Sequence, residues 1–188
     1  MKTSRLAPVL LAGMLAACGG GSGSPVLFEG SIQSIDETAV SWDELKLGLL
    51  CMESLTENSN YVYRANQIYR SQAIGSDRRF SFELPAEIED AWVGSYPFDG
   101  SSGHFMPVAY NDSNGDDVLD CDPEVFLECS EPISWLWEGG ETIGLIFVRD
   151  PSRVMGAPED MRGWILVEGL SGYSQDFDRE FTLEKQTL

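Results

Sequence analysis

Basic residues are scarce in this chain. Its 188 residues include 12 Lys and Arg against 31 Asp and Glu, and the formal net charge is -19 at pH 7. Nucleic-acid binding needs clustered Lys and Arg that contact phosphates, so this balance argues against a nucleic-acid partner. For the same reason it argues against charge-driven docking on anionic lipid.

The residue types of most catalytic and zinc sites are scarce too. His104 is the single histidine, and although Ser101 and Ser102 are close in sequence, no G-x-S-x-G motif accompanies them. No C-x-x-C pair or Cys/His spacing indicates zinc. We therefore expect no catalytic residue and a surface position for His104. A hydrolase with a carboxylate pair stays open as an alternative, because 31 acidic residues always offer some pair.

The apolar run over residues 6–17 is too short to span a bilayer, which takes ~20 residues. Lys2 and Arg5 precede it, and the combination is typical of a secretory signal peptide. The run ends in Leu15-Ala16-Ala17-Cys18, which resembles the lipobox of bacterial lipoproteins. The resemblance implies that the signal is cut away and that Cys18 carries a diacylglycerol. The alternative is an ordinary signal peptide whose cysteine is incidental.

The residues after the lipobox predict a simple domain organisation. The sequence GGGSGS over residues 19–24 is typical of a flexible tether, with a reach of ~13 Å. We predict a signal peptide over 1–17, a lipidated cysteine and tether over 18–25, and one β-sandwich domain over 26–188. Gly19 stands where an aspartate marks inner-membrane retention in enteric bacteria, which favours an anchor in the outer membrane or at the cell surface.

The body of the chain has the pattern of an all-β protein. Short segments alternate apolar and polar residues with period two, and Gly, Pro, Asn, Asp and Ser clusters separate them. This predicts an antiparallel β-sandwich of about nine strands with little helix. Pro107 indicates an edge or a bulge in its strand. The predicted strands lie within 26–33, 45–51, 61–69, 80–84, 105–110, 133–137, 143–148, 164–167 and 177–183.

One local pattern resembles a known family. The sequence RFSFELP over 79–85 is followed by HFMPVAY over 104–110, which runs into NDSNGDD over 111–117. This is similar to transthyretin-like (carboxypeptidase regulatory-like) β-sandwich modules, although Arg78 and Arg79 stand where those modules usually have glycine. The resemblance covers roughly residues 26–122, and an immunoglobulin-like sandwich is the alternative fold.

The acidic loop after residue 110 has the spacing of a calcium site. Calcium binds six to eight oxygen ligands, and alternate residues of a tightly curled loop can supply them. The loop resembles the start of an EF-hand, but Gly115 is at position four, Pro123 stands where the bidentate Glu would be, and no amphipathic helix flanks it. We therefore expect a structural Ca²⁺ in a β-loop, with another cation or a plain turn as alternatives. The predicted ligands are the side chains of Asp112, Asn114, Asp116 and Asp120 and the carbonyl of Val118.

Three cysteines remain beside Cys18. Cys121 and Cys129 bracket a short segment next to the acidic loop, and export favours oxidation, so a bridge between them is expected. It would stabilise the fold by roughly 2.5 kcal/mol. Cys51 lies on the apolar phase of its strand, which predicts a buried thiol. Pairing of Cys51 with either of the others stays open.

Two tryptophans and one loop could contact ligands. Trp135 and Trp137 share one face of a predicted strand, and packing in the core or between sheets is the favoured interpretation. The alternative is a platform that stacks on sugar rings. The loop over 94–103 is rich in Gly, Ser and aromatic residues, a composition suited to recognition or to flexibility.

Together these patterns predict a lipid-anchored β-sandwich of the cell envelope, a non-catalytic binding or structural module with a structural calcium loop. Its contact with the membrane runs through the N-terminal lipid. A protein and a glycan are both candidate ligands, and the sequence does not identify which. A surface carbohydrate-binding module that uses exposed Trp or Tyr is the first alternative.

Overall fold

The computed structural model describes residues 25–54, 61–93, 101–116, 119, 131–153, 159–169 and 172–186. In these residues the chain forms ten strands and three single-turn 3-10 segments, which confirms the all-β prediction. None of these residues belongs to a helix long and apolar enough to cross a membrane. The elements are β1 Val26–Ile32, η1 Trp42–Glu44, β2 Leu45–Ser54, β3 Tyr61–Ala73, β4 Arg79–Leu84, η2 Asp90–Trp92, β5 Ser102–Asn111, β6 Ile133–Glu138, β7 Glu141–Val148, η3 Pro151–Arg153, β8 Gly163–Glu168, β9 Gly172–Ser174 and β10 Phe181–Lys185.

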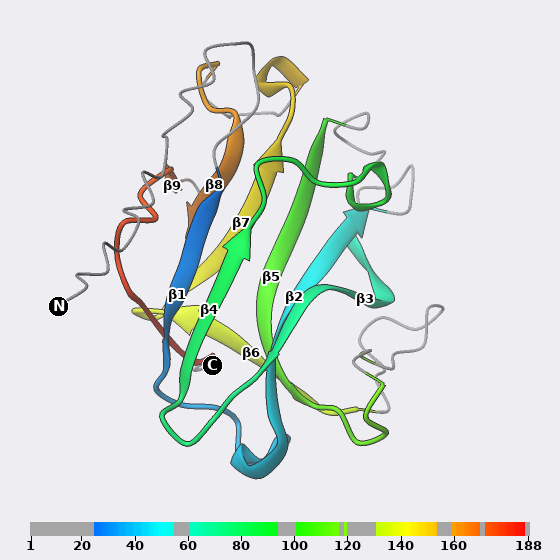
Figure 1. Cartoon of the computed structure of the whole chain (residues 1–188), viewed down its shortest axis with the longest axis vertical. Coiled ribbons are helices and arrows are strands. Elements are labelled where there is room, and N and C mark those ends of the chain that lie inside the picture. The colour runs from blue at the N-terminus through cyan, green and yellow to red at the C-terminus, as the bar shows by residue number, and fades with distance from the viewer. Residues whose placement is uncertain are drawn as a thin grey trace, which may run out of the picture.

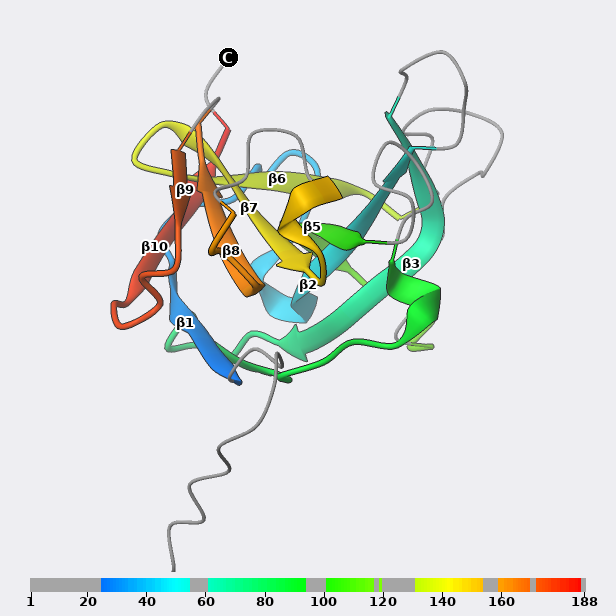
Figure 2. The same cartoon turned by 90° about the horizontal axis from the view of Figure 1, so that it is seen from above.

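The strands form a sandwich that is nearly closed into a barrel (Figures 1 and 2). Strands β4, β1, β10 and β6 make one layer, here called the front sheet, and β3, β2, β5, β7, β8 and β9 make the other, the back sheet. Strand β6 connects them, because residues 136–138 pair with β10 while residues 133–135 pair with β5. One strand is therefore shared by both layers.

The barrel remains open between β3 and β4. These strands follow each other in the chain, yet each pairs with a different neighbour, β3 with β2 and β4 with β1. A side chain spans the gap at one point, where the backbone N–H of Ser81 donates to Oε1 of Gln72 at 2.9 Å.

The two ends of the described chain meet in the front sheet. Strands β1 and β10 pair in parallel, with Gly30 opposite Phe181, inside a sandwich that is otherwise antiparallel. A β-carbon on Gly30 would lie 1.9 Å from the carbonyl oxygen of Phe181, so only glycine permits this close approach. The single strand predicted over 177–183 is wrong in detail, because β9 and β10 flank a segment in which Phe177 is buried without being in a strand.

The main core fills the space between the sheets with aromatic rings. The ring of Phe28 lies 5.1 Å from that of Phe80 and 4.8 Å from that of Phe181, centroid to centroid. At the other end Trp164 packs against Phe105, with centroids 5.4 Å apart, and its indole N–H donates to a backbone carbonyl. Burial alternates along β1 and β4 as predicted. The interior is thus packed by side chains, as expected for a small barrel.

Pro107 lies in a central strand rather than at an edge. Strand β5 pairs with β7 through residues 102–105 and with β6 through residues 108–110. Pro107 falls between these two stretches, where β2 is the only paired neighbour in the described part of the chain. The missing N–H of proline is tolerated there because it falls between the two pairings.

Candidate functional site

The outer face of the back sheet is apolar. Directly opposite residues of antiparallel strands lie on one face, which places Met52, His104, Ile146 and Ile165 in one row across four strands. An antiparallel sheet usually presents polar residues on the face away from the core. Here that face carries two buried clusters separate from the main core, one around Leu50, Val108, Tyr110 and Leu119 and one around Ile146, Val148 and Ile165.

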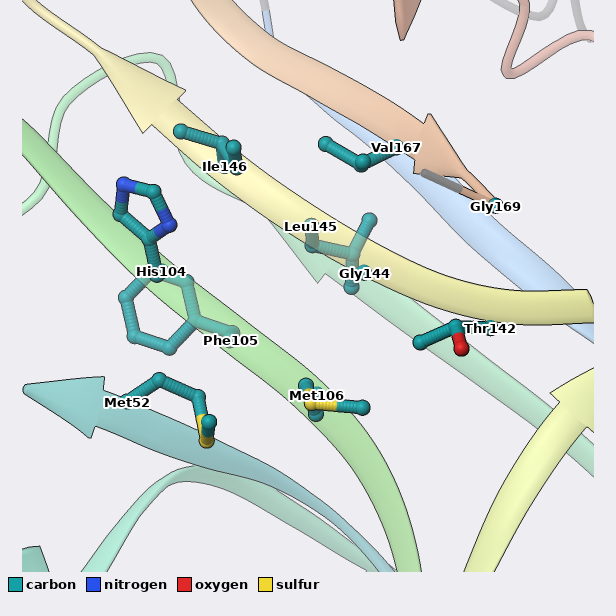
Figure 3. Close-up of a pocket in the computed structure, with 10 residues that line it drawn as sticks. All are labelled: Met52, His104, Phe105, Met106, Thr142, Gly144, Leu145, Ile146, Val167 and Gly169. Carbon is teal, nitrogen blue, oxygen red and sulfur yellow. The ribbon is translucent and has the colours of Figure 1, made fainter. Parts of the chain in front are cut away.

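A hollow of about 220 Å³ lies on this outer face, in line with the row (Figure 3). Gly144 is in its centre, where a side chain is missing. A β-carbon on Gly144 would meet nothing closer than the Phe105 carbonyl oxygen at 3.7 Å and Val167 Cβ at 3.9 Å. Hydrocarbon and thioether groups make up most of the surroundings of this glycine. The outward side chains around it are Met52, His104, Met106, Thr142, Ile146 and Val167, with Gly169 at one end.

His104 contributes an uncharged wall to this hollow. Burial lowers the pKa of His104 to about 4, so the imidazole is neutral near pH 7. Its Nε2 lies 3.2 Å from Oγ of Ser102. Ser102 is 0 % exposed, so its hydroxyl holds the ring and is out of reach of a substrate. The sequence predicted a surface position for His104, whereas the structure places it, half-buried, at the edge of the hollow.

A polar hollow of about 340 Å³ adjoins the apolar one, and Thr142 lines both. It lies at the tight turn between β6 and β7, where Gly139 and Gly140 have positive φ. Arg179 donates to both oxygens of Glu138, at 3.0 and 2.9 Å, and also forms an ion pair with Glu168. The guanidinium therefore neutralises part of the charge of this carboxylate pair.

The tryptophan pair does not belong to the main core. On β6 it is Leu136, 0 % exposed, and Ser134, 2 % exposed, that face inward. Trp135 and Trp137 are half-buried on the opposite face, and Trp135 packs against the outer cluster around Tyr110. The prediction that the two tryptophans pack in the core is thus wrong for the main core. It holds only for Trp135, which packs against the outer cluster.

The acidic loop brings three of its five predicted ligands together. Oδ1 of Asp112 accepts the backbone N–H of Gly115 at 2.6 Å and that of Asp116 at 3.2 Å. The amide of Asn114 donates to Oδ2 of Asp116 at 3.1 Å. Val118 and Asp120 lie outside the described residues.

Asp112 already has a cation beside it. The ammonium of Lys46, on β2, forms an ion pair with Oδ2 of Asp112, whose side chain is 1 % exposed. The buried Glu131 accepts the N–H of Ser113 at 2.7 Å and its hydroxyl at 3.1 Å. No group of three or more His, Cys, Asp or Glu in the described ranges is placed to hold a metal ion. In this arrangement lysine and backbone N–H groups satisfy Asp112.

Several predicted features fall on residues that the structure does not describe. These are the signal peptide over 1–17, Cys18 with its tether, the Cys121–Cys129 bridge and most of the 94–103 loop. Cys51 is 5 % exposed and belongs to the main core, as predicted for a buried thiol.

The apolar hollow was not predicted from the sequence. A signal for it exists, because residues 143–148 read IGLIFV, an almost continuous apolar run interrupted by one glycine. Such a run indicates a strand buried on both faces. In this strand Ile143, Leu145 and Phe147 face the main core, while Ile146 and Val148 form part of an outer cluster.

Comparison of the chain with protein-family models, with curated proteins and with solved structures found no match.

Proposed function

We propose that this protein is a lipid-anchored, non-catalytic binding module of the cell envelope, and that it binds a small apolar ligand on the outer face of the back sheet. The observation that carries the proposal is the hollow centred on Gly144. The main core is packed with buried side chains, whereas the hollow lies on the outside of the sheet. The outer hollow is open, preformed and lined by side chains that water solvates poorly.

The size of the hollow sets the class of ligand. Pockets for drug-sized molecules measure ~300–1,000 Å³, whereas ~150 Å³ accommodates a single benzene ring. A hollow of about 220 Å³ therefore suits a short alkyl chain or one ring. Methionines are adaptable and polarizable, so Met52 and Met106 can adjust to either shape.

The binding proposal is tested with 1-hexanol as the probe. We expect saturable shifts of amide NMR signals around Gly144, with Kd on the order of 1 mM, which corresponds to about -4 kcal/mol. Gly144→Leu fills the hollow and should abolish these shifts. Thr182→Leu adds the same side chain at an exposed position of β10 in the front sheet and should not. Shifts that persist in Gly144→Leu would place the ligand elsewhere.

The anchor is the second part of the proposal. The lipobox sequence at residues 15–18 supports it, and the GGGSGS tether would keep the folded body just off the membrane. Acyl chains contribute ~0.8 kcal/mol per buried methylene, which suffices for firm retention with two or three chains. We expect Cys18→Ser to move the protein from the membrane fraction to the soluble fraction in cells. Retention of the Cys18→Ser variant in membranes would refute the lipid anchor.

A glycan-binding module remains the second candidate function. The half-buried, outward position of Trp135 and Trp137 favours it, because sugar rings stack on accessible indoles. We expect Trp137→Ala to abolish binding to a glycan array if this candidate is right. Trp42→Ala, which removes a half-buried indole stacked on Arg78, is the matched control.

A further inference from the structure

We infer that the outer hollow selects ligands that carry a cationic group beside their apolar part, with Glu141 as the residue that receives the cation. The inference rests on the proposed binding function and names the chemistry of its ligand as a small alkylammonium compound.

The position of Glu141 is the first observation. Gly169 lines the hollow, and Oε2 of Glu141 lies 2.7 Å from the point where a β-carbon on Gly169 would stand. Only a glycine therefore separates this carboxylate from the hollow. Gly169 has a φ of +63°, a conformation that disfavours any larger residue there.

The second observation is the state of the charges around Glu141. It is directly opposite Glu138 across the β6–β7 pair, and like charges at such positions repel. Arg179 relieves Glu138 and Glu168, to which it is bonded. Glu141 itself forms no hydrogen bond or ion pair with the parts of the chain that the structure describes. A bound cation would reduce the repulsion that remains.

The neighbouring groups favour an organic cation over a metal ion. A divalent metal needs several oxygen ligands. Glu138, Glu141 and Glu168 all line the polar hollow, but no group of three or more His, Cys, Asp or Glu among the described residues is placed to hold a metal ion. An ammonium group needs one carboxylate, and its alkyl part can occupy the hydrocarbon-lined hollow. The neutral imidazole of His104 adds no positive charge to the apolar hollow. The guanidinium of Arg179 lines the polar hollow together with Glu141, and its charge is paired with Glu138 and Glu168. The overall charge of -19 further raises the local concentration of cations.

Three probes of equal chain length separate the contribution of the charged group to binding from that of the alkyl chain. Hexylammonium, 1-hexanol and hexanoate are titrated against the protein at low ionic strength, with the NMR shifts around Gly144 as the readout. An exposed ion pair contributes ~0.2–1 kcal/mol, so we expect hexylammonium to bind about 1.4- to fivefold tighter than 1-hexanol. Hexanoate should bind more weakly than 1-hexanol. Salt on the order of 1 M should remove most of the difference between hexylammonium and 1-hexanol.

Two variants test whether Glu141 causes the preference for hexylammonium over 1-hexanol. Glu141→Gln should lower the affinity for hexylammonium to that for 1-hexanol, while Glu83→Gln, on the exposed face of β4, should keep the preference. Equal binding of all three probes to the unchanged protein would overturn the inference and leave the proposed function standing. A preference that survives Glu141→Gln would overturn the role of Glu141. Binding of none of the three probes would overturn the proposed function itself.

Discussion

The two faces of the back sheet are both apolar, but they are packed differently. On the inner face, Phe105, Phe147 and Trp164 interlock at centroid distances of 5.3 and 5.4 Å and belong to one continuous core. On the outer face the apolar residues form two small clusters, and a hollow adjoins the one that contains Ile146. The inner face therefore supplies the stability of the fold. The outer face has no side chain at Gly144, and the space beside this glycine provides room for a ligand.

Alanine substitutions of one glycine in each sheet should differ most in their effect on stability. We expect Gly30→Ala, in the front sheet, to lower the free energy of unfolding more than any other change proposed here. Its new β-carbon would collide with the backbone of Phe181 in β10, which cannot move without breaking the β1–β10 pairing. We expect a loss of about 3 kcal/mol or more in the free energy of unfolding, measured by urea titration. A loss below about 1 kcal/mol would mean that the two strands are not in close contact.

The second largest expected effect is a dependence of the protein's stability on pH, caused by His104 on the outer face of the back sheet. The folded-state pKa of His104 is about 4, below its unfolded value near 6.5, because burial disfavours the charged ring. The unfolded chain therefore binds the proton first as the pH falls. Stability is expected to decline between about pH 6.5 and pH 4, by up to about 2–3 kcal/mol.

The variant His104→Gln isolates this contribution, because the many carboxylates titrate equally in both proteins. The difference between the two unfolding free energies, measured from pH 7 to pH 4, should shrink as the pH falls. Parallel stability curves would show that the imidazole is hydrated in the folded protein.

Substitution of Asp112 tests whether polar contacts outside the main core also stabilise the fold. Asp112→Ala removes the ion pair to Lys46 and the acceptor of two backbone N–H groups. We expect a loss of about 2 kcal/mol by urea titration. Asp112→Asn retains an acceptor for the N–H groups and should lose about half as much. A neutral result for Asp112→Ala would mean that the pair is solvated.

We expect added Ca²⁺ to change the stability of the protein less than Asp112→Ala does. For a site with a Kd on the order of 10⁻⁴ M, about 1 mM Ca²⁺ stabilises by about 1.4 kcal/mol, which raises Tm by about 3–6 °C. EDTA should reverse the shift, and Asp112→Ala should abolish it. The absence of a shift with either reagent would leave the loop as a plain turn held by Lys46 and its own backbone.

Gly144→Ala should have the smallest effect and completes the contrast with Gly30→Ala. The added methyl group makes ordinary van der Waals contact without a clash, because its nearest neighbour is 3.7 Å away. We expect the unfolding free energy to stay within about 0.5 kcal/mol of the original protein or to rise slightly. A large loss would show that the hollow is occupied by another part of the chain.

The sequence predicted the strands well because many have one clear apolar phase. Phe80, Phe82 and Leu84 alternate with exposed residues, so period two locates both the strand and its buried face. The prediction was less successful where both phases are apolar. In β6, Trp135, Leu136 and Trp137 leave the inward face undecided, and the structure turns the leucine inward.

The site itself was harder to predict than the strands. The group formed by Glu138, Glu168 and Arg179 comes from three segments, and only strand pairing brings them together. The hollow depends on one missing side chain in an otherwise apolar run. Neither feature has a short motif, whereas the acidic loop has one and was singled out for that reason.

The parallel pairing of β1 with β10 has a consequence for the order in which the chain can fold. Synthesis proceeds from the N-terminus, so residues 26–32 are made long before their partners at 181–183. Until those last residues emerge, β1 has only β4 beside it, and Phe28 lacks the ring of Phe181. A chain halted or shortened before residue 181 should consequently leave an incomplete front layer that is sensitive to proteases, however well its other strands are formed.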